Sequence, residues 1–189
     1  MKRFFSYFIT VITSFSCQEK KAERVFISSE SKDISIVNDT VFYKHEKFNG
    51  ILFQLNTNNK DSLFSEEIEY GLLNGVSKKW FANNQLMEYR EYKMGRKDGK
   101  QIAFWDNGKK RFEFVAKNDA YEGEMKEWSY NGKLYHLAHY VNGQEEGSQK
   151  MWYENGKIRA NYVIVNGKRF GLLGTKNCKN VSDSIFIVK

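Results

Sequence analysis

Glycine recurs at a spacing of 24 residues through the middle of this chain, and that regularity limits the possible folds more than any other feature. The glycines are Gly75, Gly99, Gly123, Gly147 and Gly171, and an aromatic residue stands five positions after each of the first four. A fixed short period is typical of arrays built from one supersecondary unit, in which each unit packs on its neighbours. The sequence therefore predicts a repeat protein, whose repeats generate extended surfaces.

Each repeat consists of two short runs separated by turn residues. The first turns are Asn83-Asn84, Asn107-Gly108, Asn131-Gly132 and Asn155-Gly156, and the second turns are Met94-Gly95, Asn118-Asp119, Asn142-Gly143 and Asn166-Gly167. Residues that tolerate positive φ are required by two-residue type I′ hairpin loops. Turns at both ends of every run predict an all-β fold, an elongated antiparallel meander of β-hairpin repeats with a 24-residue period and no crossover helix.

A two-residue first turn also predicts which side chains face each other across each hairpin. The expected pairs are Trp80 with Met87, Phe104 with Arg111, Trp128 with Tyr135, and Trp152 with Arg159. Aromatic rings then lie beside the side chains of charged residues in a single-layer sheet. The guanidinium groups of Arg111 and Arg159 are expected to lie over aromatic rings. We take the resulting column as the candidate binding surface: Trp80, Phe104, Arg111, Trp128, Tyr135, Trp152 and Arg159.

Two stretches, residues 152–157 (Trp-Tyr-Glu-Asn-Gly-Lys) and 130–133 (Tyr-Asn-Gly-Lys), resemble the MORN repeat family, specifically its bacterial variant, which is often labelled a YwqK-type antitoxin. The resemblance covers about residues 47–173, and Asn84 and Asp119 depart from it where the family has glycine. It implies a non-enzymatic protein-binding or scaffold role. The alternative it implies is an antitoxin or immunity-type protein that neutralises a toxin.

The N-terminus has the pattern of an export signal. Lys2-Arg3 precedes thirteen mostly apolar or small residues, Phe4 to Ser16, and then come Cys17 and a polar run. This apolar stretch is too short to span a bilayer comfortably. Residues 14–17 (Ser-Phe-Ser-Cys) resemble a bacterial lipobox, which implies that the Cys17 thiol is lipidated and anchors the exported protein to a membrane of the cell envelope. An ordinary signal, giving a secreted or periplasmic protein, and a membrane-tucked apolar strand remain alternatives.

These features divide the chain into four parts. We expect a signal peptide at 1–16, a lipid-anchored spacer with capping strands at 17–45, the repeat array at 46–173 and a C-terminal capping strand at 174–189. Alternation at 34–37 and 41–43 indicates the first capping strands. Cys178 is interpreted as a buried or turn-end cysteine, with a reactive thiol as the alternative.

Motifs for chemistry are sparse. His136 and His139 are three residues apart, which places them on opposite faces of a strand, so they are poor joint metal ligands, and His136 should face Glu127 across its hairpin. The net charge of +7 comes from Lys and Arg interleaved with Glu, as on a solvated face, so we expect no nucleic-acid partner. A hydrolase of envelope polymers would need clustered carboxylates or a nucleophile. The sequence therefore predicts no enzyme activity, no cofactor and no metal, and a protein partner.

Overall fold

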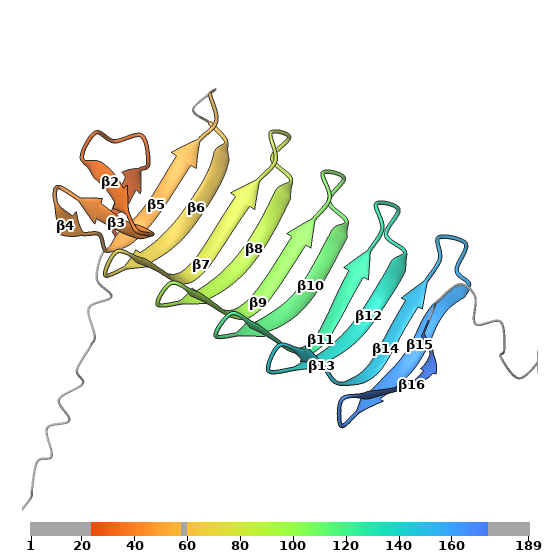
Figure 1. The fold of residues 1–189 in the computed structure, drawn as a ribbon. Helices are drawn as coiled ribbons and strands as arrows, with labels where there is room; N and C mark the ends of the chain where they lie inside the picture. The colour runs from red at the N-terminus through yellow and green to blue at the C-terminus, as the bar shows by residue number, and fades with distance from the viewer. Residues whose placement is uncertain (1–23, 58–59, 174–189) are drawn as a thin grey trace, which may run out of the picture.

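A computed structural model describes residues 24–57 and 60–173, which contain sixteen strands and no helix. The predicted all-β meander is therefore confirmed (Figure 1). In this part of the chain no helix is long and apolar enough to cross a membrane. The expected signal peptide, Cys17, Cys178 and the C-terminal capping strand lie outside the described residues.

Most strands form one long sheet in which chain order is also spatial order, and neighbours from β5 onward run antiparallel. They are β5 (Gly50–Leu55), β6 (Ser62–Glu69), β7 (Leu72–Trp80), β8 (Leu86–Lys93), β9 (Arg96–Phe104), β10 (Lys110–Lys117), β11 (Ala120–Trp128), β12 (Leu134–Val141), β14 (Gly147–Trp152), β15 (Ile158–Val165) and β16 (Lys168–Leu172). The short β13 (Gln144–Glu145) also pairs with β12, and β1 (Phe26–Ser28) pairs in parallel with β5. The result is an elongated, twisted staircase of hairpins (Figure 1).

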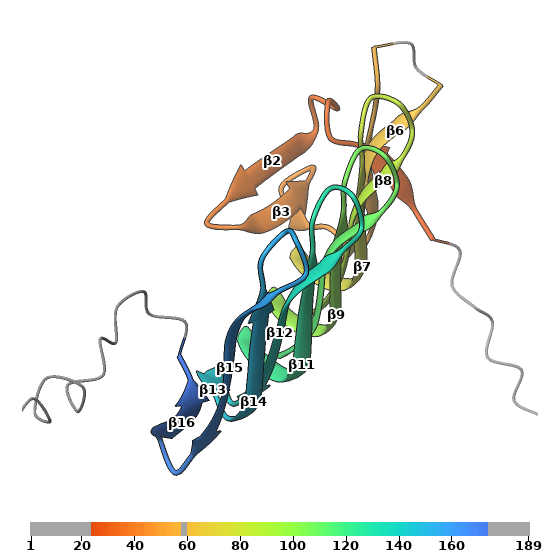
Figure 2. The ribbon, with the colours of Figure 1, turned by 90° about the vertical axis from the view of Figure 1, so that its right-hand side faces the viewer.

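A small second sheet covers only the N-terminal end of this staircase (Figure 2). It consists of β2 (Ile34–Val37), β3 (Thr40–Tyr43) and β4 (Glu46–Lys47). Its Val41 packs with Phe48, Leu52 and Ile68 in the larger of the two apolar clusters that the described residues form. Beyond β7 the long sheet is a single layer, so its side chains stack mainly on those of neighbouring strands.

The second turns adopt the predicted type I′ geometry. In the third repeat Asn142 and Gly143 both have positive φ, 51° and 80°, and Val141 lies opposite Gln144. The same two-residue loop occurs at Met94-Gly95, Asn118-Asp119 and Asn166-Gly167. These loops match the right-handed twist of the strands they join.

The first turns differ from the prediction: they are three-residue loops. In the second repeat the Gly108 N–H donates to the Trp105 carbonyl (2.9 Å) and the Trp105 N–H donates to the Lys109 carbonyl (2.8 Å). Gly108 has φ 79°, whereas Asn107 does not have positive φ and instead accepts the Lys109 N–H through Oδ1 (3.0 Å). This arrangement is a type I turn followed by one left-handed residue. Asn-Gly thus serves both loop types in this chain.

The longer loop changes the register, so the expected cross-hairpin pairs are wrong. Each register shift leaves one residue of the returning strand without a direct partner, as at a β-bulge. Trp128 lies opposite Leu134 and Glu127 opposite His136, which leaves Tyr135 between them. In the same way Trp80 lies opposite Leu86, Phe104 opposite Lys110 and Trp152 opposite Ile158, and the residues passed over are Met87, Arg111 and Arg159.

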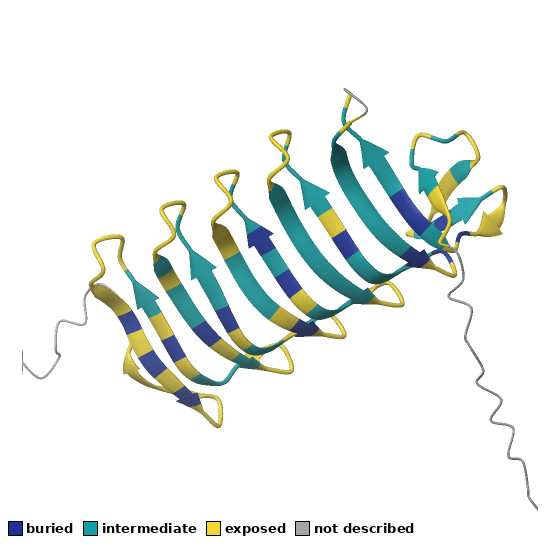
Figure 3. Cartoon of the chain, turned by 180° about the vertical axis from the view of Figure 1, so that it is seen from behind, coloured by how far each residue is buried: buried dark blue, intermediate teal, exposed yellow. Residues whose placement is uncertain are grey.

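Positions that pair across strands share a face, which defines two faces of the sheet. Along these strands short buried segments, dark blue in Figure 3, are interspersed with intermediate and exposed residues. Face A carries the continuous row Phe64, Lys79, Glu88, Ala103, Phe112, Glu127, His136, Met151 and Ala160. Face B carries the row Lys78, Tyr89, Ile102, Glu113, Lys126, Leu137, Lys150 and Asn161. Leu52 and Ile68, in the cluster under the small sheet, also belong to face A.

Candidate binding surface

Face A carries a continuous run of aromatic side chains across the middle of the sheet. The Arg90 guanidinium lies over the Phe112 ring (5.6 Å), and Phe112 contacts Phe114 with ring centroids 5.7 Å apart. Phe114 then packs on Tyr121 (4.4 Å) and Tyr121 stacks on Tyr140 (5.0 Å). The small sheet does not reach this run, and the Tyr121 side chain is 40% exposed. Exposed aromatic rings in a continuous patch are typical of interaction sites.

An ion pair and a histidine–carboxylate contact hold polar side chains beside the aromatic run. Arg90 donates to both carboxylate oxygens of Glu88, through Nε (3.0 Å) and Nη2 (2.9 Å). These hydrogen bonds lower the pKa of Glu88 and raise the pKa of Arg90. Two hairpins further along the sheet, His136 Nδ1 on β12 lies 2.7 Å from Glu127 Oε2 on β11, as predicted. Side chains held in this way are preorganised for binding.

A hollow with a cavity volume of 430 Å³ opens beside these groups. We call it the aromatic hollow, and its lining residues are Arg90, Lys97, Trp105, Arg111, Phe112, Phe114, Tyr121, Met125, Glu127 and Tyr135. Three of them are cationic and only Glu127 is acidic. Arg90 is paired with Glu88, so Lys97 and Arg111, which outnumber the single acidic residue Glu127, give the aromatic hollow its excess of positive charge. The surface therefore suits an acidic group attached to an apolar or aromatic body.

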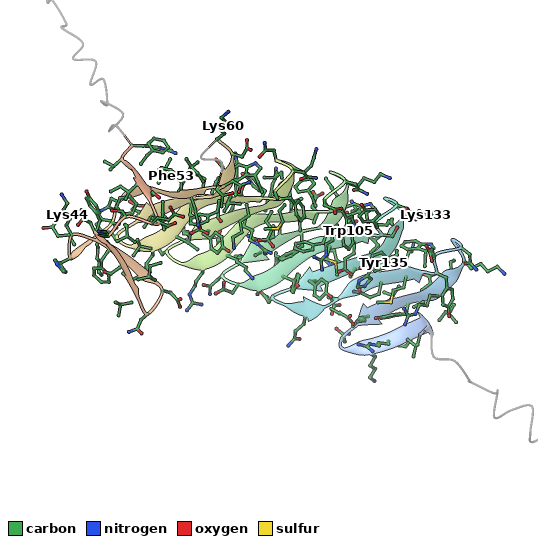
Figure 4. The ribbon with its side chains drawn as sticks, turned by 90° about the horizontal axis from the view of Figure 1, so that it is seen from above. Lys44, Phe53, Lys60, Trp105, Lys133 and Tyr135 are labelled. Atoms are coloured by element: carbon green, nitrogen blue, oxygen red, sulfur yellow. The ribbon has the colours of Figure 1, made fainter. Side chains whose placement is uncertain are left out.

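The turn end of the aromatic hollow is braced by contacts between successive repeats. Two of the lining residues, Trp105 and Tyr135, are labelled in Figure 4. Arg111 lies over the Trp105 ring (4.9 Å), as the sequence predicted for this arginine. The Trp105 indole N–H donates to the carbonyl of Trp128 in the next repeat (3.1 Å), and the Asn107 side chain donates to the Tyr130 carbonyl (3.0 Å). These bonds hold neighbouring loops in one line.

The structure divides the predicted binding column between the two faces. By strand alternation Trp80, Phe104, Trp128 and Trp152 project on face B, where the Lys110 ammonium lies over the Trp128 ring (5.7 Å). Arg111 and Tyr135 instead line the aromatic hollow. There, burial and the Glu127 carboxylate raise the pKa of Tyr135. Arg159 lies near Trp152 and Tyr153, beside the three-residue loop that contains Asn155-Gly156.

Sequence reasoning missed the centre of the surface, which consists of Arg90, Phe112, Phe114, Tyr121 and Tyr140. Arg90 and Phe114 share one position of the 24-residue unit but differ in residue type, and Phe112, Tyr121 and Tyr140 each occupy another position, so a search for identical columns passes over them. The alternation of aromatic and polar residues at Phe112, Glu113 and Phe114 was the available signal, because it places both rings on one face.

The described residues contain no group of three or more His, Cys, Asp or Glu side chains that could hold a metal ion. His136 and His139 lie on opposite faces, as predicted, and His139 Nδ1 lies 3.2 Å from the Glu146 carbonyl. What the geometry does offer is an extended, braced surface.

A single-layer array of β-hairpins with an uncovered aromatic run defines a β-repeat protein with an extended surface. Three segments, residues 73–94, 121–142 and 145–162, match the MORN repeat variant family. They coincide with β7–β8, β11–β12 and β13–β15, and the intervening β9–β10 hairpin has the same turns. Comparison with curated proteins gives no match. MORN repeats are generally protein- or membrane-binding modules without catalytic activity.

Proposed function

We propose that this protein is a non-enzymatic binding module that presents the aromatic hollow of face A to an acidic segment of a partner protein. The observation that carries the proposal is the uncovered aromatic run from Phe112 to Tyr140, bordered by Lys97 and Arg111. Aromatic and arginine side chains supply most binding hot spots at protein interfaces, and cationic borders steer acidic partners. The matches to a family of binding repeats support this assignment.

Removal of the Tyr121 ring is expected to weaken capture of the partner by about tenfold or more, the usual effect of losing an interface hot spot. Tyr121→Ala and Arg111→Gln are compared with Tyr89→Ala, which deletes an aromatic ring from face B. Photo-crosslinking from position 121 or 89 in the membrane fraction identifies the captured protein, and titration of that purified protein gives the affinity. Thermal melts establish that all variants are folded.

Salt dependence provides a second arm of the same experiment. Binding through Lys97 and Arg111 should weaken as ionic strength rises, because salt screens exposed charges. Equal losses for Tyr121→Ala and Tyr89→Ala, or salt-independent binding, would contradict the assignment of face A.

We further propose that the module is tethered to a bacterial membrane surface through a lipid on Cys17. The support is the lipobox-like sequence at residues 14–17 behind a charged and apolar leader. A lipid chain adds about 0.8 kcal/mol of membrane affinity per buried methylene, which would keep the binding face near the membrane.

Cys17→Ser is expected to abolish lipid attachment and leave the repeat fold unchanged, because Cys17 precedes the described strands. Metabolic labelling with a fatty-acid analogue measures attachment, and Cys178→Ser is the matched control that should retain the label. Label of equal intensity in wild type and Cys17→Ser would rule out the anchor.

An antitoxin or immunity role is the alternative, and the same face supports it, because neutralising a toxin also requires a preorganised surface. It predicts a single dedicated partner that is toxic when expressed alone. Rescue by co-expressed wild type but not by Tyr121→Ala would favour this reading over a scaffold.

A further inference from the structure

The three-residue loops lie along one long edge of the sheet, and each of them sets one residue apart from the strand pairing (Figure 1). The residues set apart in this way are spaced 24 residues apart, and we call them the unpaired column: Met87, Arg111, Tyr135 and Arg159. A two-residue loop would have placed each of them opposite an aromatic ring or its equivalent in the same hairpin. The longer loops therefore determine what this column contacts.

Neighbouring members of the unpaired column line the same hollows. Met87 and Arg111 both line a hollow of 380 Å³, and Arg111 and Tyr135 both line the aromatic hollow. Tyr135 and Arg159 both line a third hollow of 330 Å³. Because Arg111 and Tyr135 each belong to two hollows, the three hollows form one groove that crosses the strands. We call it the loop-edge groove.

The two outer hollows carry the same charges at equivalent positions, two repeats apart. Arg111 in the first corresponds to Arg159 in the other, and Asp106 corresponds to Glu154. Both arginines are exposed, and neither forms an ion pair within residues 24–57 and 60–173. Each repeat adds two strands about 4.8 Å apart, so the two arginines recur at an interval of about 19 Å, with the uncharged Tyr135 midway.

A polyproline II segment matches this interval. It rises about 3.1 Å per residue with three residues per turn, so every third side chain faces the same side at steps of about 9.3 Å. One repeat of the sheet spans about 9.5 Å, so each turn of the segment meets one member of the unpaired column. In a β-strand, by contrast, side chains three residues apart point to opposite sides. Grooves lined by aromatic rings bind polyproline II segments at low entropic cost, because this conformation exists before binding.

We infer that the loop-edge groove binds a polyproline II segment of the partner protein, with acidic side chains six residues apart and an apolar side chain midway between them. The acidic groups contact Arg111 and Arg159, and the apolar side chain packs on Tyr135. Asp106 and Glu154 repel acidic side chains placed elsewhere in the outer hollows, which makes the spacing selective. The inference rests on the proposed function and specifies the form of the acidic segment.

Two labelled peptides of identical composition and with capped ends test the spacing on the full-length protein. The first, Asp-Pro-Pro-Leu-Pro-Pro-Asp, has its carboxylates six residues apart, and the second, Asp-Pro-Pro-Leu-Pro-Asp-Pro, has them five residues apart. Only the first places both carboxylates on the side that faces the two arginines. Fluorescence anisotropy should therefore show that it binds about fivefold more tightly, as expected for one additional exposed charge pair.

Variants of the protein assign each contact. Arg159→Gln should weaken binding of the first peptide about fivefold, whereas Lys150→Gln, which removes the same charge from face B, should change it little. The effect of Arg159→Gln should disappear when one particular aspartate of the peptide is replaced by asparagine, and the effect of Arg111→Gln should disappear with the other aspartate. Thermal melts establish that the variants are folded.

Equal affinities for the two peptides, no binding of the first, or an effect of Arg159→Gln no larger than that of Lys150→Gln would overturn the inference. Partner capture separates this failure from failure of the proposed function. If Tyr121→Ala weakens capture and Arg159→Gln does not, the aromatic hollow binds the partner and the longer groove does not. Unchanged capture by both Tyr121→Ala and Arg111→Gln would instead refute the proposed function.

Discussion

Gly99→Ala is expected to destabilise the protein by about 3–5 kcal/mol, combining backbone strain with the loss of a carboxylate contact. Gly99 has φ +108°, and a Cβ there would lie 2.1 Å from Glu91 Oε2 and 2.9 Å from Glu91 Cβ. That carboxylate accepts the Lys100 N–H (2.8 Å) and the Tyr89 hydroxyl (2.8 Å). Displacing Glu91 therefore leaves the Lys100 N–H on β9 and the Tyr89 hydroxyl on β8 without their acceptor. Urea denaturation measures the loss.

Gly123→Ala is the matched control for this prediction. Gly123 holds the same place in the next repeat with φ +73°, and a Cβ there would meet no atom within 4 Å. Backbone strain alone predicts a loss of about 1 kcal/mol. If the two substitutions cost the same, the close approach of Glu91 is not what requires glycine at position 99.

Phe48→Ala is expected to cost about 3–5 kcal/mol, as for other large side chains removed from a core. Phe48 is 3% exposed and joins the small sheet to the long one through contacts with Val41, Leu52 and Ile68. Its backbone is also engaged, since its N–H donates to the Val41 carbonyl (3.0 Å) and its carbonyl accepts the Gly71 N–H (2.8 Å). We expect the loss to appear first as faster hydrogen exchange in β2, β3 and β4.

Phe53→Ala provides the comparison, because this ring lies on the neighbouring strand β5 and on face B, where it is only partly buried. A distinctly smaller loss is expected for it. Should Phe53→Ala be as damaging as Phe48→Ala, the stability of the N-terminal end would not depend on the core beneath the small sheet.

The architecture could be predicted from the sequence because its determinants are local. The second turns need two consecutive residues with positive φ, and residue pairs such as Asn142-Gly143 and Asn166-Gly167 are typical of such turns. The first turns use the same residue pair differently: in Asn107-Gly108 only the glycine is left-handed. An Asn-Gly pair alone does not distinguish these loops, and the register depends on the choice.

The binding surface was less predictable, because it depends on that register. The predicted pair Trp128 and Tyr135 ends on different faces, since the register shift leaves Tyr135 without a direct partner. The aromatic run also joins Phe114 to Tyr121 and Tyr140, which occupy unrelated positions in the repeat. Such a surface becomes visible only after every strand has been placed against its neighbour.

The even spacing of the hairpins allows the length of the sheet to change by whole repeat units. Strands begin at Leu72, Arg96, Ala120, Gln144 and Lys168, so duplication of one unit would add two strands and leave the orientation of every other side chain unchanged. Each such step would lengthen the sheet by about 9.5 Å, twice the spacing of paired strands. Loss of a single residue within a strand would instead turn the following side chains to the opposite face. Length can therefore change in evolution by whole units far more readily than by single residues.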